Sequence, residues 1–461
     1  MIKKNYKILL VNVINDKTEV ETRYPNLGLG YLASCVRDKL GEDRFIFKII
    51  DRDLIESTKK FKPDLIGVTC VSQNYNRAKE YIEKVHNKKV PIIMGGIHIT
   101  LLPETLSKFC LAGCMSEGEQ TFVDIVKLLI ENQLTKKKLS EVPGVVYWKW
   151  NKMVRTKPRE LIKDLDIIPF PARDLMKIDS HTYMFTSRGC PYRCVFCASS
   201  RFWNKLRFFS ADYVVEEIEV LVNEYGVEMI SFFDDLFVAD KVRLKKIATL
   251  LKKKKLIGKV KFTCSCRSNL VDKEMVKILK EMGTVSVGMG LESGNDKVLS
   301  YLKGSTVKVK DNYKAVSLLK KAGIAANGSF VIGSPKETGA QIMDTYRFIK
   351  KSGLDLFDVY ILTPYPGTPV WDYAKSKGLV SEKDFDWSRL NVNAYIMDKK
   401  DVLIVSEGLS RSDVIRYYKK FRRLRMMHNI LRVAGHPMVK DVPKMVRKLA
   451  IERVYNIFGK K

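Results

Sequence analysis

Short apolar runs alternate with amphipathic stretches over the first 145 residues of the chain. The apolar runs lack a regular polar alternation, which is typical of parallel strands buried on both faces. The sequence therefore predicts an α/β domain with a doubly wound sheet, whose ligands lie at the carboxyl ends of the strands. The expected strands are Ile8–Val13, Phe45–Ile50, Leu65–Thr69 and Pro91–Met94, and the expected helices include Gly30–Leu40 and Arg77–His86.

A second alternation begins at His181 and contains six strand candidates. Six β/α units are too few for a closed eight-stranded barrel, so the pattern predicts an open, partial (β/α)6 barrel. Active sites of β/α barrels lie at the carboxyl ends of the strands. The expected strands are Thr182–Thr186, Met229–Phe233, Lys261–Thr263, Val285–Met289, Asn327–Ile332 and Leu356–Leu362, separated by helical runs such as Val214–Tyr225 and Asp311–Ala322.

These patterns divide the chain into four predicted regions. A small hairpin is expected at Val145–Trp150, where the first alternation ends, and the second alternation fades after Lys375. The regions are a doubly wound domain (1–145), a linker (146–180), a partial barrel (181–375) and a basic, mainly helical C-terminal region (376–461).

Composition narrows the class of protein. With 46% hydrophobic and 29% charged residues among 461, the chain has an ordinary globular balance. It has no apolar run of the roughly 18 residues that a membrane-spanning helix needs. Nine cysteines, unevenly spread, suit a reducing cytoplasm and not a disulfide framework. The net charge of +30 leaves nucleic acid, an anionic membrane surface and anionic cofactors as candidate partners.

Three of the cysteines, Cys190, Cys194 and Cys197, fall within eight residues, just after an expected strand. Three thiolates on one loop can hold three corners of a cubane iron–sulfur cluster, which normally takes four cysteine ligands. The remaining iron can then bind a small molecule. A structural zinc loop is the alternative, but it needs four ligands in paired spacings, and no second pair follows at a suitable distance. Clustering also disfavours three unrelated buried thiols.

The spacing CxxxCxxC, with Phe196 before the last cysteine, resembles the signature loop of radical S-adenosylmethionine (radical SAM) enzymes. The resemblance implies a [4Fe-4S] cluster on the three cysteines, with SAM chelating the open iron through its amino and carboxylate groups. It further implies reductive cleavage of SAM to methionine and a 5′-deoxyadenosyl radical. Phe196 is expected to lie against the adenine.

Polar and glycine motifs follow the other barrel strands and resemble those of radical SAM enzymes that carry a cobalamin domain. SAM presents an ammonium, a carboxylate and a ribose, which call for carboxylate, arginine and other polar partners. Taken singly, each carboxylate fits a helix cap or a surface ion pair equally well. Together, in order at strand ends, they favour a SAM site. The residues expected there are Asp234, Asp235, Arg267, Glu292, Ser293 and Gly333.

Motifs of residues 1–145 resemble the cobalamin-binding Rossmann domain that precedes many radical SAM barrels. Many cobalamin domains supply a histidine ligand to cobalt after the first strand, but here no histidine precedes His86. Radical SAM members often lack this histidine too. The alternative is a degenerate domain that has lost cobalamin. The expected cobalamin contacts are Leu27, Gly28, Thr69, Gly95, Gly96, His98, Glu117 and Gly118.

The C-terminal region is strongly basic, with 15 Lys or Arg against 3 Asp or Glu in residues 411–461. Apolar residues from Val442 to Ile457 recur at helical spacing. A basic amphipathic helix can lie on an anionic membrane, or it can pack on the barrel with its charges solvated. Nucleic acid is disfavoured, because no RNA-binding module is recognisable.

The cysteine usage predicts a cytoplasmic protein, and the basic tail makes contact with the inner membrane surface one of its expected locations. The resemblance implies an enzyme. The expected reaction is cobalamin-dependent methylation of an unactivated carbon in a lipid-like or other small molecule. Its expected electron donor is a protein such as flavodoxin or ferredoxin. One alternative is a radical SAM cyclase or dehydrogenating enzyme without functional cobalamin. Another is a non-catalytic iron–sulfur sensor that binds membrane or nucleic acid.

Overall fold

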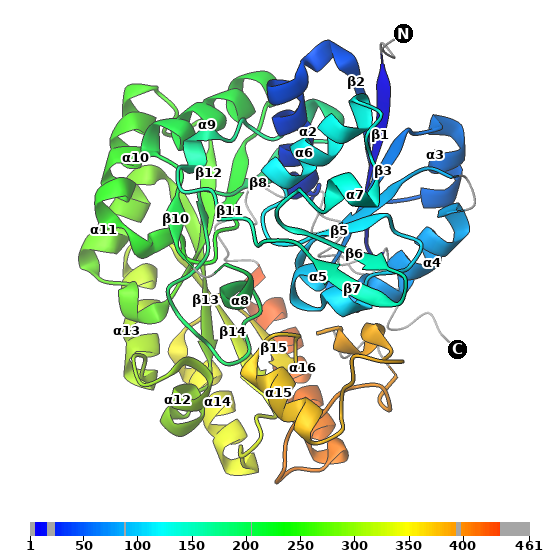
Figure 1. Cartoon of the computed structure of the whole chain (residues 1–461). Helices are drawn as coiled ribbons and strands as arrows, with labels where there is room; N and C mark the ends of the chain where they lie inside the picture. The colour runs from blue at the N-terminus through cyan, green and yellow to red at the C-terminus, as the bar shows by residue number, and fades with distance from the viewer. Residues whose placement is uncertain (1–4, 16–23, 87–88, 204, 393–397, 434–461) are drawn as a thin grey trace, which may run out of the picture. The chain divides into compact units, whose positions relative to one another are not determined.

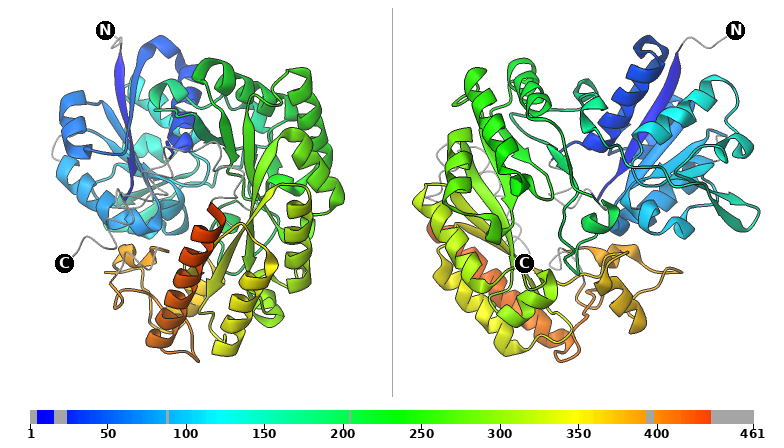
Figure 2. Two further views of the ribbon diagram at one scale, coloured as in Figure 1. Left: turned by 180° about the vertical axis from the view of Figure 1, so that it is seen from behind. Right: turned by 60° about the vertical axis from the view of Figure 1, so that its left-hand side comes forward.

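The computed structural model describes residues 5–15, 24–86, 89–203, 205–392 and 398–433. The chain forms two compact units (Figure 1, Figure 2). The first unit comprises Met1–Glu228 and Thr363–Val405, and the second comprises Met229–Leu362 and Ser406–Lys461.

A seven-stranded sheet forms the centre of the first unit, in the order β2-β1-β3-β4-β5-β6-β7. Strands β1 to β5 are parallel, and the hairpin β6–β7 extends the sheet in antiparallel fashion. The strand order reverses between β1 and β3, which makes their carboxyl ends the place where such sheets bind ligands. The strands are β1 (Tyr6–Val13), β2 (Phe45–Ile50), β3 (Leu65–Cys70), β4 (Ile92–Gly95), β5 (Ala112–Cys114), β6 (Val145–Lys149) and β7 (Lys152–Arg155).

Helices cover this sheet because its central strands are apolar throughout. Residues 8–11 of β1 are fully buried, so both faces of the strand need a covering layer. Helix α2 packs beside α6, and α3 packs beside α4. The main helices are α2 (Leu27–Leu40), α3 (Leu54–Phe61), α4 (Tyr75–Val85), α5 (Ile97–Leu101), α6 (Glu119–Ile130), α7 (Lys136–Leu139), α9 (Ala211–Tyr225) and α15 (Pro369–Ser376).

The second unit contains five parallel strands, β11 to β15, which are neighbours in sequence order. A helix follows each strand, and these helices lie along the outside of the strands (Figure 1). The strands are β11 (Met229–Phe232), β12 (Lys261–Cys266), β13 (Thr284–Glu292), β14 (Ala325–Ile332) and β15 (Leu356–Ile361). The helices are α10 (Lys241–Lys253), α11 (Lys273–Met282), α12 (Asp296–Lys303), α13 (Val309–Lys321), α14 (Gly339–Ser352) and α16 (Arg411–Val433).

Stacked aromatic rings fill the start of this second core. The ring of Phe232 lies 4.2 Å from that of Phe237 and 5.1 Å from that of Phe262, nearly parallel to both. All three side chains are buried. Offset stacking of this kind adds to the free energy gained by removing the rings from water.

All ten expected strands form, and the predicted α/β fold class, a doubly wound domain followed by parallel β/α units, is confirmed. The first of the six expected barrel strands, Thr182–Thr186, is β8 (His181–Met184). Strand β12 is longer than expected and includes Cys264 and Cys266. The hairpin expected beside the linker joins the first sheet as its edge. Strand β5, with three residues, is too short to produce a periodic pattern and was not expected.

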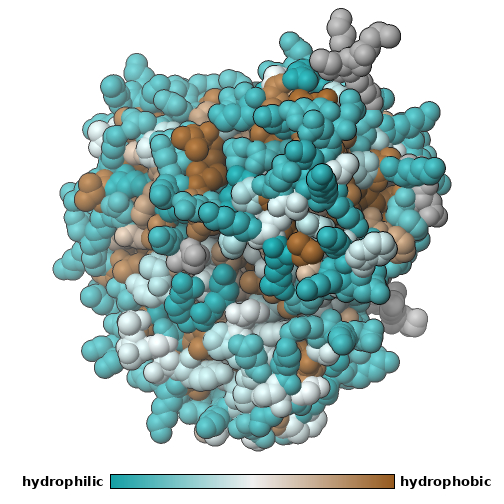
Figure 3. All heavy atoms as spheres, in the orientation of Figure 1, coloured by the Kyte–Doolittle hydropathy of each residue, from teal (hydrophilic) through white to brown (hydrophobic). Residues whose placement is uncertain are grey.

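In the basic C-terminal region, residues 411–433 form helix α16, whereas the described residues between 377 and 410 are mostly turns and loops with one short helix, η9 (Trp387–Leu390). Helix α16 packs along β15, with Val414 and Phe421 buried. The amphipathic pattern at Val442–Ile457 lies outside the described residues. The face drawn in Figure 3 is mostly hydrophilic, with scattered apolar patches. None of the helices among the described residues has the length and apolarity that a membrane crossing requires.

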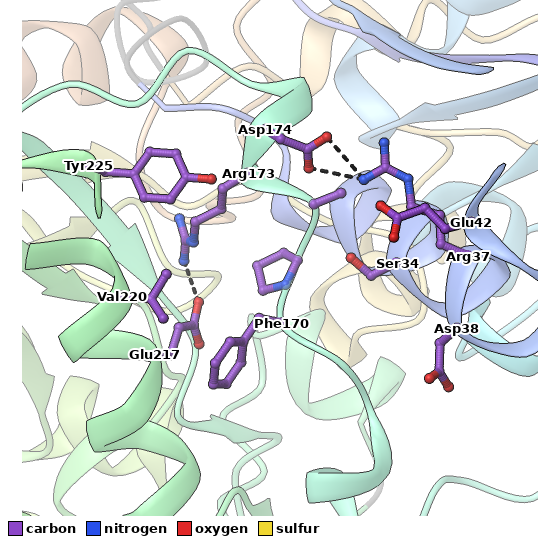
Figure 4. Close-up of a pocket in the computed structure, with 12 residues that line it drawn as sticks. Ser34, Arg37, Asp38, Glu42, Phe170, Arg173, Asp174, Glu217, Val220 and Tyr225 are labelled. Carbon is purple, nitrogen blue, oxygen red and sulfur yellow. Dashed lines mark hydrogen bonds and ion pairs between the residues drawn. The ribbon is translucent and has the colours of Figure 1, made fainter. Parts of the chain in front are cut away.

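A buried ion pair, Arg173–Glu217, ties the linker to α9 within the first unit (Figure 4). The guanidinium nitrogen lies 2.5 Å from the carboxylate oxygen and also donates to the carbonyl of Tyr183. The two side chains are only 3% and 1% exposed, and burial raises the pKa of Glu217. The pair lines a cavity of about 370 Å³ between α2, the linker and α9.

Replacing Arg173 by leucine is expected to lower the free energy of unfolding by about 3–5 kcal/mol, because the carboxylate of Glu217 stays buried without its partner. The double variant Arg173→Leu/Glu217→Leu should recover most of that loss, since no buried charge remains. Calorimetric unfolding of the full chain measures both. Lys84→Ala, which breaks an exposed ion pair with Glu80, is the control and should change little. Equal losses in the single and double Arg173 variants would contradict the argument.

Candidate functional site

The three cysteines expected to hold the cluster lie on one loop of the first unit. The loop leaves β9 (Ser187–Arg188) and runs through α8 (Ser199–Phe202) to β10 (Arg207–Phe208), which pairs with β9. The backbone N–H of Cys197 donates to the carbonyl of Cys194, and the hydroxyl of Ser200 donates to the carbonyl of Cys197. These hydrogen bonds fold the short segment that carries the three thiols into a tight turn.

Gly189, directly before the first cysteine, is required by this geometry. Its φ is +90°, a conformation that side chains rarely adopt. A Cβ atom there would lie 2.4 Å from the carbonyl oxygen of Lys205 and 2.9 Å from the Cβ of Trp203. The two ends of the cysteine loop therefore touch, and a side chain at residue 189 would force them apart.

The thiols fit an iron–sulfur cluster better than a single metal ion. Cys190, Cys194 and Cys197 are all half-buried, so they face neither bulk solvent nor a packed core. Among the described residues, no three His, Cys, Asp or Glu side chains converge as the ligands of one ion do. The ligands of a cubane each bind a different iron and therefore stand farther apart.

Phe196 is part of this loop, and the end of the predicted barrel region contacts the loop. Phe196 stands between Cys194 and Cys197 in the sequence, and its side chain is half-buried. The backbone N–H of Val370, at the start of α15, donates to the carbonyl of Val195. Thr368 caps α15 by accepting a bond from the N–H of Trp371. The start of α15 thus contacts the cysteine loop within the first unit.

In the second unit, the expected SAM residues occupy the carboxyl ends of the strands. Asp234 and Asp235 follow β11, but only Asp234 is buried, while Asp235 is exposed. Arg267 follows β12, is buried, and donates to the carbonyl of Lys303 and the hydroxyl of Thr306, both at 3.0 Å. Adjacent carboxylates of one motif therefore stand in different environments and cannot share one role.

Glu292 ends β13 in an unusual conformation. Its φ is +58°, a left-handed value that is uncommon for a residue with a side chain. Its carboxylate is buried, and Oε1 lies 3.5 Å from the ammonium of Lys303. Burial raises the pKa of Glu292, while Lys303 and Arg267 act against the rise. Strain and a buried charge together at a strand end are typical of a functional site.

Lys303 is a site residue that the sequence did not reveal. It ends α12, and its ammonium also donates to the carbonyl of Gly290. Its backbone carbonyl accepts a hydrogen bond from Arg267, and its ammonium forms an ion pair with Glu292. Lys303 therefore contacts both of these residues, which are expected to bind SAM. A lysine in the last turn of a helix is an ordinary sequence feature, and nothing local marks it as buried.

Two further strand-end residues are held by their own turns. The hydroxyl of Ser293 accepts the N–H of Asn295 and lies 3.2 Å from that of Thr345, so it stabilises the turn after β13. Gly333 has a φ of +85°, and its N–H donates to Glu337 at 2.7 Å. Burial raises the pKa of Glu337 to about 7, against the lowering effect of the N–H groups of Ser334 and Gly333. Both residues therefore present backbone rather than free side chains.

The first unit brings several expected cobalamin residues to one sheet edge. Thr69 at the end of β3 is paired in register with Gly95 at the end of β4. Gly96 has a φ of +93°, and a Cβ there would lie 2.4 Å from the Oγ1 of Thr69. Gly96 therefore lets the chain turn closely past Thr69 at the edge where sheets of this strand order bind ligands.

Other expected cobalamin residues lie at helix starts near the strand ends. Leu27 and Gly28 begin α2, where Leu27 is buried and its N–H donates to the hydroxyl of Tyr183, while Gly28 is exposed. Gly118 precedes α6 and is half-buried. Exposed or half-buried glycine at a helix start leaves the backbone open to a ligand.

His98 is buried, and both of its ring nitrogens are hydrogen-bonded within the protein. Nδ1 lies 3.0 Å from the hydroxyl of Ser72, and Nε2 lies 3.0 Å from the hydroxyl of Thr105. The ring stacks on Tyr75 and meets Trp387 edge-on. Burial lowers the pKa of His98 to about 3, so the ring is neutral. Neither nitrogen is available to cobalt in this arrangement.

Glu117 is also committed to the protein. One oxygen accepts from Arg188 and Arg207, and the other accepts from Arg207 and the N–H of Ile162, at 2.6 to 3.1 Å. These four bonds use the whole acceptor capacity of a carboxylate. Arg188 and Arg207, which flank the cysteine loop, were not expected as site residues, because isolated arginines in a basic chain carry no signal.

Two protein families match the chain in this order. The "B12 binding domain" family matches residues 16–126, and the "Radical SAM superfamily" matches residues 184–349. An uncharacterized methyltransferase of Pyrococcus horikoshii is 36% identical over 403 residues, which cover 82% of this chain and 85% of that protein. The anaerobic magnesium-protoporphyrin IX monomethyl ester cyclase of Cereibacter sphaeroides is 26% identical, over 87% of this chain and 68% of its own length.

A solved structure has the same fold. The radical S-adenosylmethionine methyltransferase TsrM of Kitasatospora setae, with tryptophan and a SAM analogue bound, superposes with a TM-score of 0.68 at 18% identity, covering 80% of this chain and 76% of that chain. Another structure of TsrM holds cobalamin and a [4Fe-4S] cluster. The chain belongs to the radical SAM enzymes that carry an N-terminal B12-binding domain, a family of methyltransferases and cyclases that use a [4Fe-4S] cluster, SAM and cobalamin.

Proposed function

We propose that this enzyme methylates an unactivated carbon of a lipid-like or other small molecule. The observation that carries the proposal is the loop of three half-buried thiols in a chain that also has a B12-binding domain. A methyltransferase that is 36% identical over most of both chains supports methyl transfer as the reaction. When bound, the cluster and cobalamin supply the electron for SAM cleavage and the carrier of the methyl group.

Cys190, Cys194 and Cys197 would hold the cluster. Three thiolates leave one of four irons without a protein ligand, and SAM requires that opening. Gly189 lets the loop close, and the carbonyls of Cys194 and Cys197 are occupied within it, so the loop is shaped before the cluster arrives. Phe196 would offer its ring face to the adenine.

The residues at the strand ends of the second unit would bind SAM. Glu292 would accept a hydrogen bond from the ammonium of SAM. In the structure, its carboxylate is paired with the ammonium of Lys303. Arg267 would attract the carboxylate of SAM. Asp234, which is buried, and Asp235, which is exposed, would contribute carboxylates to the same site. Ser293 and Gly333 would contribute backbone groups, because their turns are fixed internally.

The sheet edge of the first unit would hold cobalamin through Leu27, Gly28, Thr69, Gly95, Gly96 and Gly118. His98 is assigned to packing, because its nitrogens bond to Ser72 and Thr105. Glu117 is assigned to Arg188 and Arg207 instead of the cofactor. This edge would then hold cobalamin without a contact from His98.

We also propose an electron donor and a cellular location for this enzyme. A flavodoxin- or ferredoxin-type protein would supply the electrons in the cytoplasm. Helix α16 is basic and exposes Met426 and Met427, which suits peripheral contact with an anionic membrane. Nucleic acid remains disfavoured as a partner. A cyclase is the second candidate, supported by the 26% identical relative. A non-catalytic sensor is disfavoured, since it needs no buried carboxylate at a SAM site.

Anaerobic purification from cells supplied with cobalamin is expected to yield about four iron atoms per chain. Corrin should co-purify, and SAM with a reductant should give 5′-deoxyadenosine. Iron analysis, absorption spectra and chromatography measure these three quantities. Iron and SAM cleavage without corrin would favour the cyclase. The absence of SAM cleavage would contradict both enzymatic proposals.

The triple variant Cys190→Ala/Cys194→Ala/Cys197→Ala is expected to lose both iron and SAM cleavage, because no thiolate remains on the loop. Cys110→Ala removes a buried thiol of the same unit and serves as the matched control, which should keep its iron. Iron analysis and the absorption of the cluster distinguish the two. Iron retained by the triple variant would show that the cluster is bound elsewhere.

Glu292→Gln is expected to raise the KM for SAM about tenfold, because a charge-assisted hydrogen bond to an ammonium is replaced by a neutral one. Iron content should be unchanged. Initial rates of 5′-deoxyadenosine formation over a range of SAM concentrations give the KM. Glu281→Gln, at an exposed ion pair of the same unit, is the control. An unchanged KM in Glu292→Gln would remove this carboxylate from the SAM site.

A further inference from the structure

Two arginines stand directly opposite each other where the cysteine loop begins and ends. Arg188 of β9 and Arg207 of β10 are cross-strand partners in a two-stranded ribbon. Like charges in such positions repel each other. The ribbon can form only because other groups compensate these charges.

Two glutamates from the B12-binding domain provide that compensation. Glu117 contacts both arginines, at 2.6 Å to Arg188 and 2.9 Å to Arg207, and Glu119 contacts Arg188 at 2.5 Å. We call Glu117, Glu119, Arg188 and Arg207 the stem cluster. All four side chains are at most 10% exposed, and their formal charges cancel. Charges this deeply buried hold a defined geometry, because water cannot replace the partners.

Aromatic rings complete the stem cluster. Trp203, which lies within the cysteine loop, is placed over both guanidinium groups at 5.5 Å. Tyr31 of α2 lies 5.6 Å from the guanidinium of Arg188. Cation–π contacts of this kind are strongest where the cation is desolvated. The loop is therefore joined to α2 and α6 of the B12-binding domain by rings as well as by ion pairs.

The positions of the four residues link two sites. Arg188 is two residues before Cys190, and Gly189 between them tolerates no side chain. Glu117 lies in the short loop between β5 and α6, and Glu119 is the first residue of α6; the carboxyl end of β5 belongs to the edge proposed to hold cobalamin. A displacement at that edge therefore reaches the first cluster cysteine through side chains that are already in contact.

We infer that the stem cluster positions the iron–sulfur loop from the B12-binding domain, so that cobalamin binding steadies the cluster. Arg188 and Glu119 are positioning residues, since neither touches iron or SAM in this role. The inference rests on the proposed function, because it requires a cluster on the loop and cobalamin at the sheet edge.

Two conservative variants test the stem cluster. Arg188→Lys keeps the charge but loses the fork that reaches both glutamates, and Glu119→Gln keeps the shape but loses the charge. Both should retain iron, because the thiols are intact. With SAM bound, the electron paramagnetic resonance spectrum of the reduced cluster should shift or broaden, and kcat for SAM cleavage should fall about tenfold with little change in KM.

Glu104→Gln is the matched control, since it breaks an exposed ion pair with Arg155 in the same domain. It should show the spectrum and rates of the wild type. Folded Arg188→Lys and Glu119→Gln proteins with wild-type spectra and rates would overturn the inference. A wild-type protein without iron or SAM cleavage would instead refute the proposed function, so the two failures are distinct.

A measurement on the wild type covers the case in which a variant does not fold. Hydrogen–deuterium exchange of the iron-loaded protein is compared with and without hydroxocobalamin. The inference predicts slower exchange of the amides of β9 and β10 when cobalamin is bound, because opening of the stem becomes rarer. Slower exchange confined to the sheet edge, with β9 and β10 unchanged while corrin is bound, would contradict it.

Discussion

Buried pairs of guanidinium and carboxylate groups are the interactions on which the first unit depends. The cysteine loop has little regular structure of its own, and a loop of that kind is positioned only by what grips its ends. Arg188 and Arg207, at the two ends of the loop, both form ion pairs with Glu117. Arg173, in the linker that precedes the loop, forms an ion pair with Glu217 of α9. Each pair is desolvated, so each tolerates little displacement.

The second unit places its polar groups by another means. Its parallel strands end at one edge, and that topology alone gathers side chains that are far apart in sequence. Glu292, with its positive φ, and Arg267 both contact Lys303, one through the side chain and one through the backbone. A lysine at this place keeps the buried carboxylate compensated in the structure, and the ammonium of SAM has the same charge.

The patterns that repeat along the chain made much of the fold predictable. Apolar strands of four or more residues were identified because the burial of both faces excludes polar residues from them. Strand β5 was not predicted, because three residues carry no period; helix α6 after it begins at Glu119, and Glu117 lies in the loop between the two. The cysteine spacing was informative because it is local. His98 was expected near the carboxyl end of β4, where it lies. Its hydrogen bonds to Ser72 and Thr105, which lie 26 and 7 positions away, could not be predicted from a local pattern.

By itself, the sequence determined the class of fold, the family, the three cysteines and the order of the strand-end motifs, because all of these are written in short-range patterns. The tertiary structure decided which charges are buried and with whom they pair. It committed Glu117 to two arginines about 70 and 90 residues away, brought Lys303 to Glu292, and closed His98 off from any ligand. Pairing across such separations depends on packing, and a buried ionic group and an exposed one look alike in a sequence.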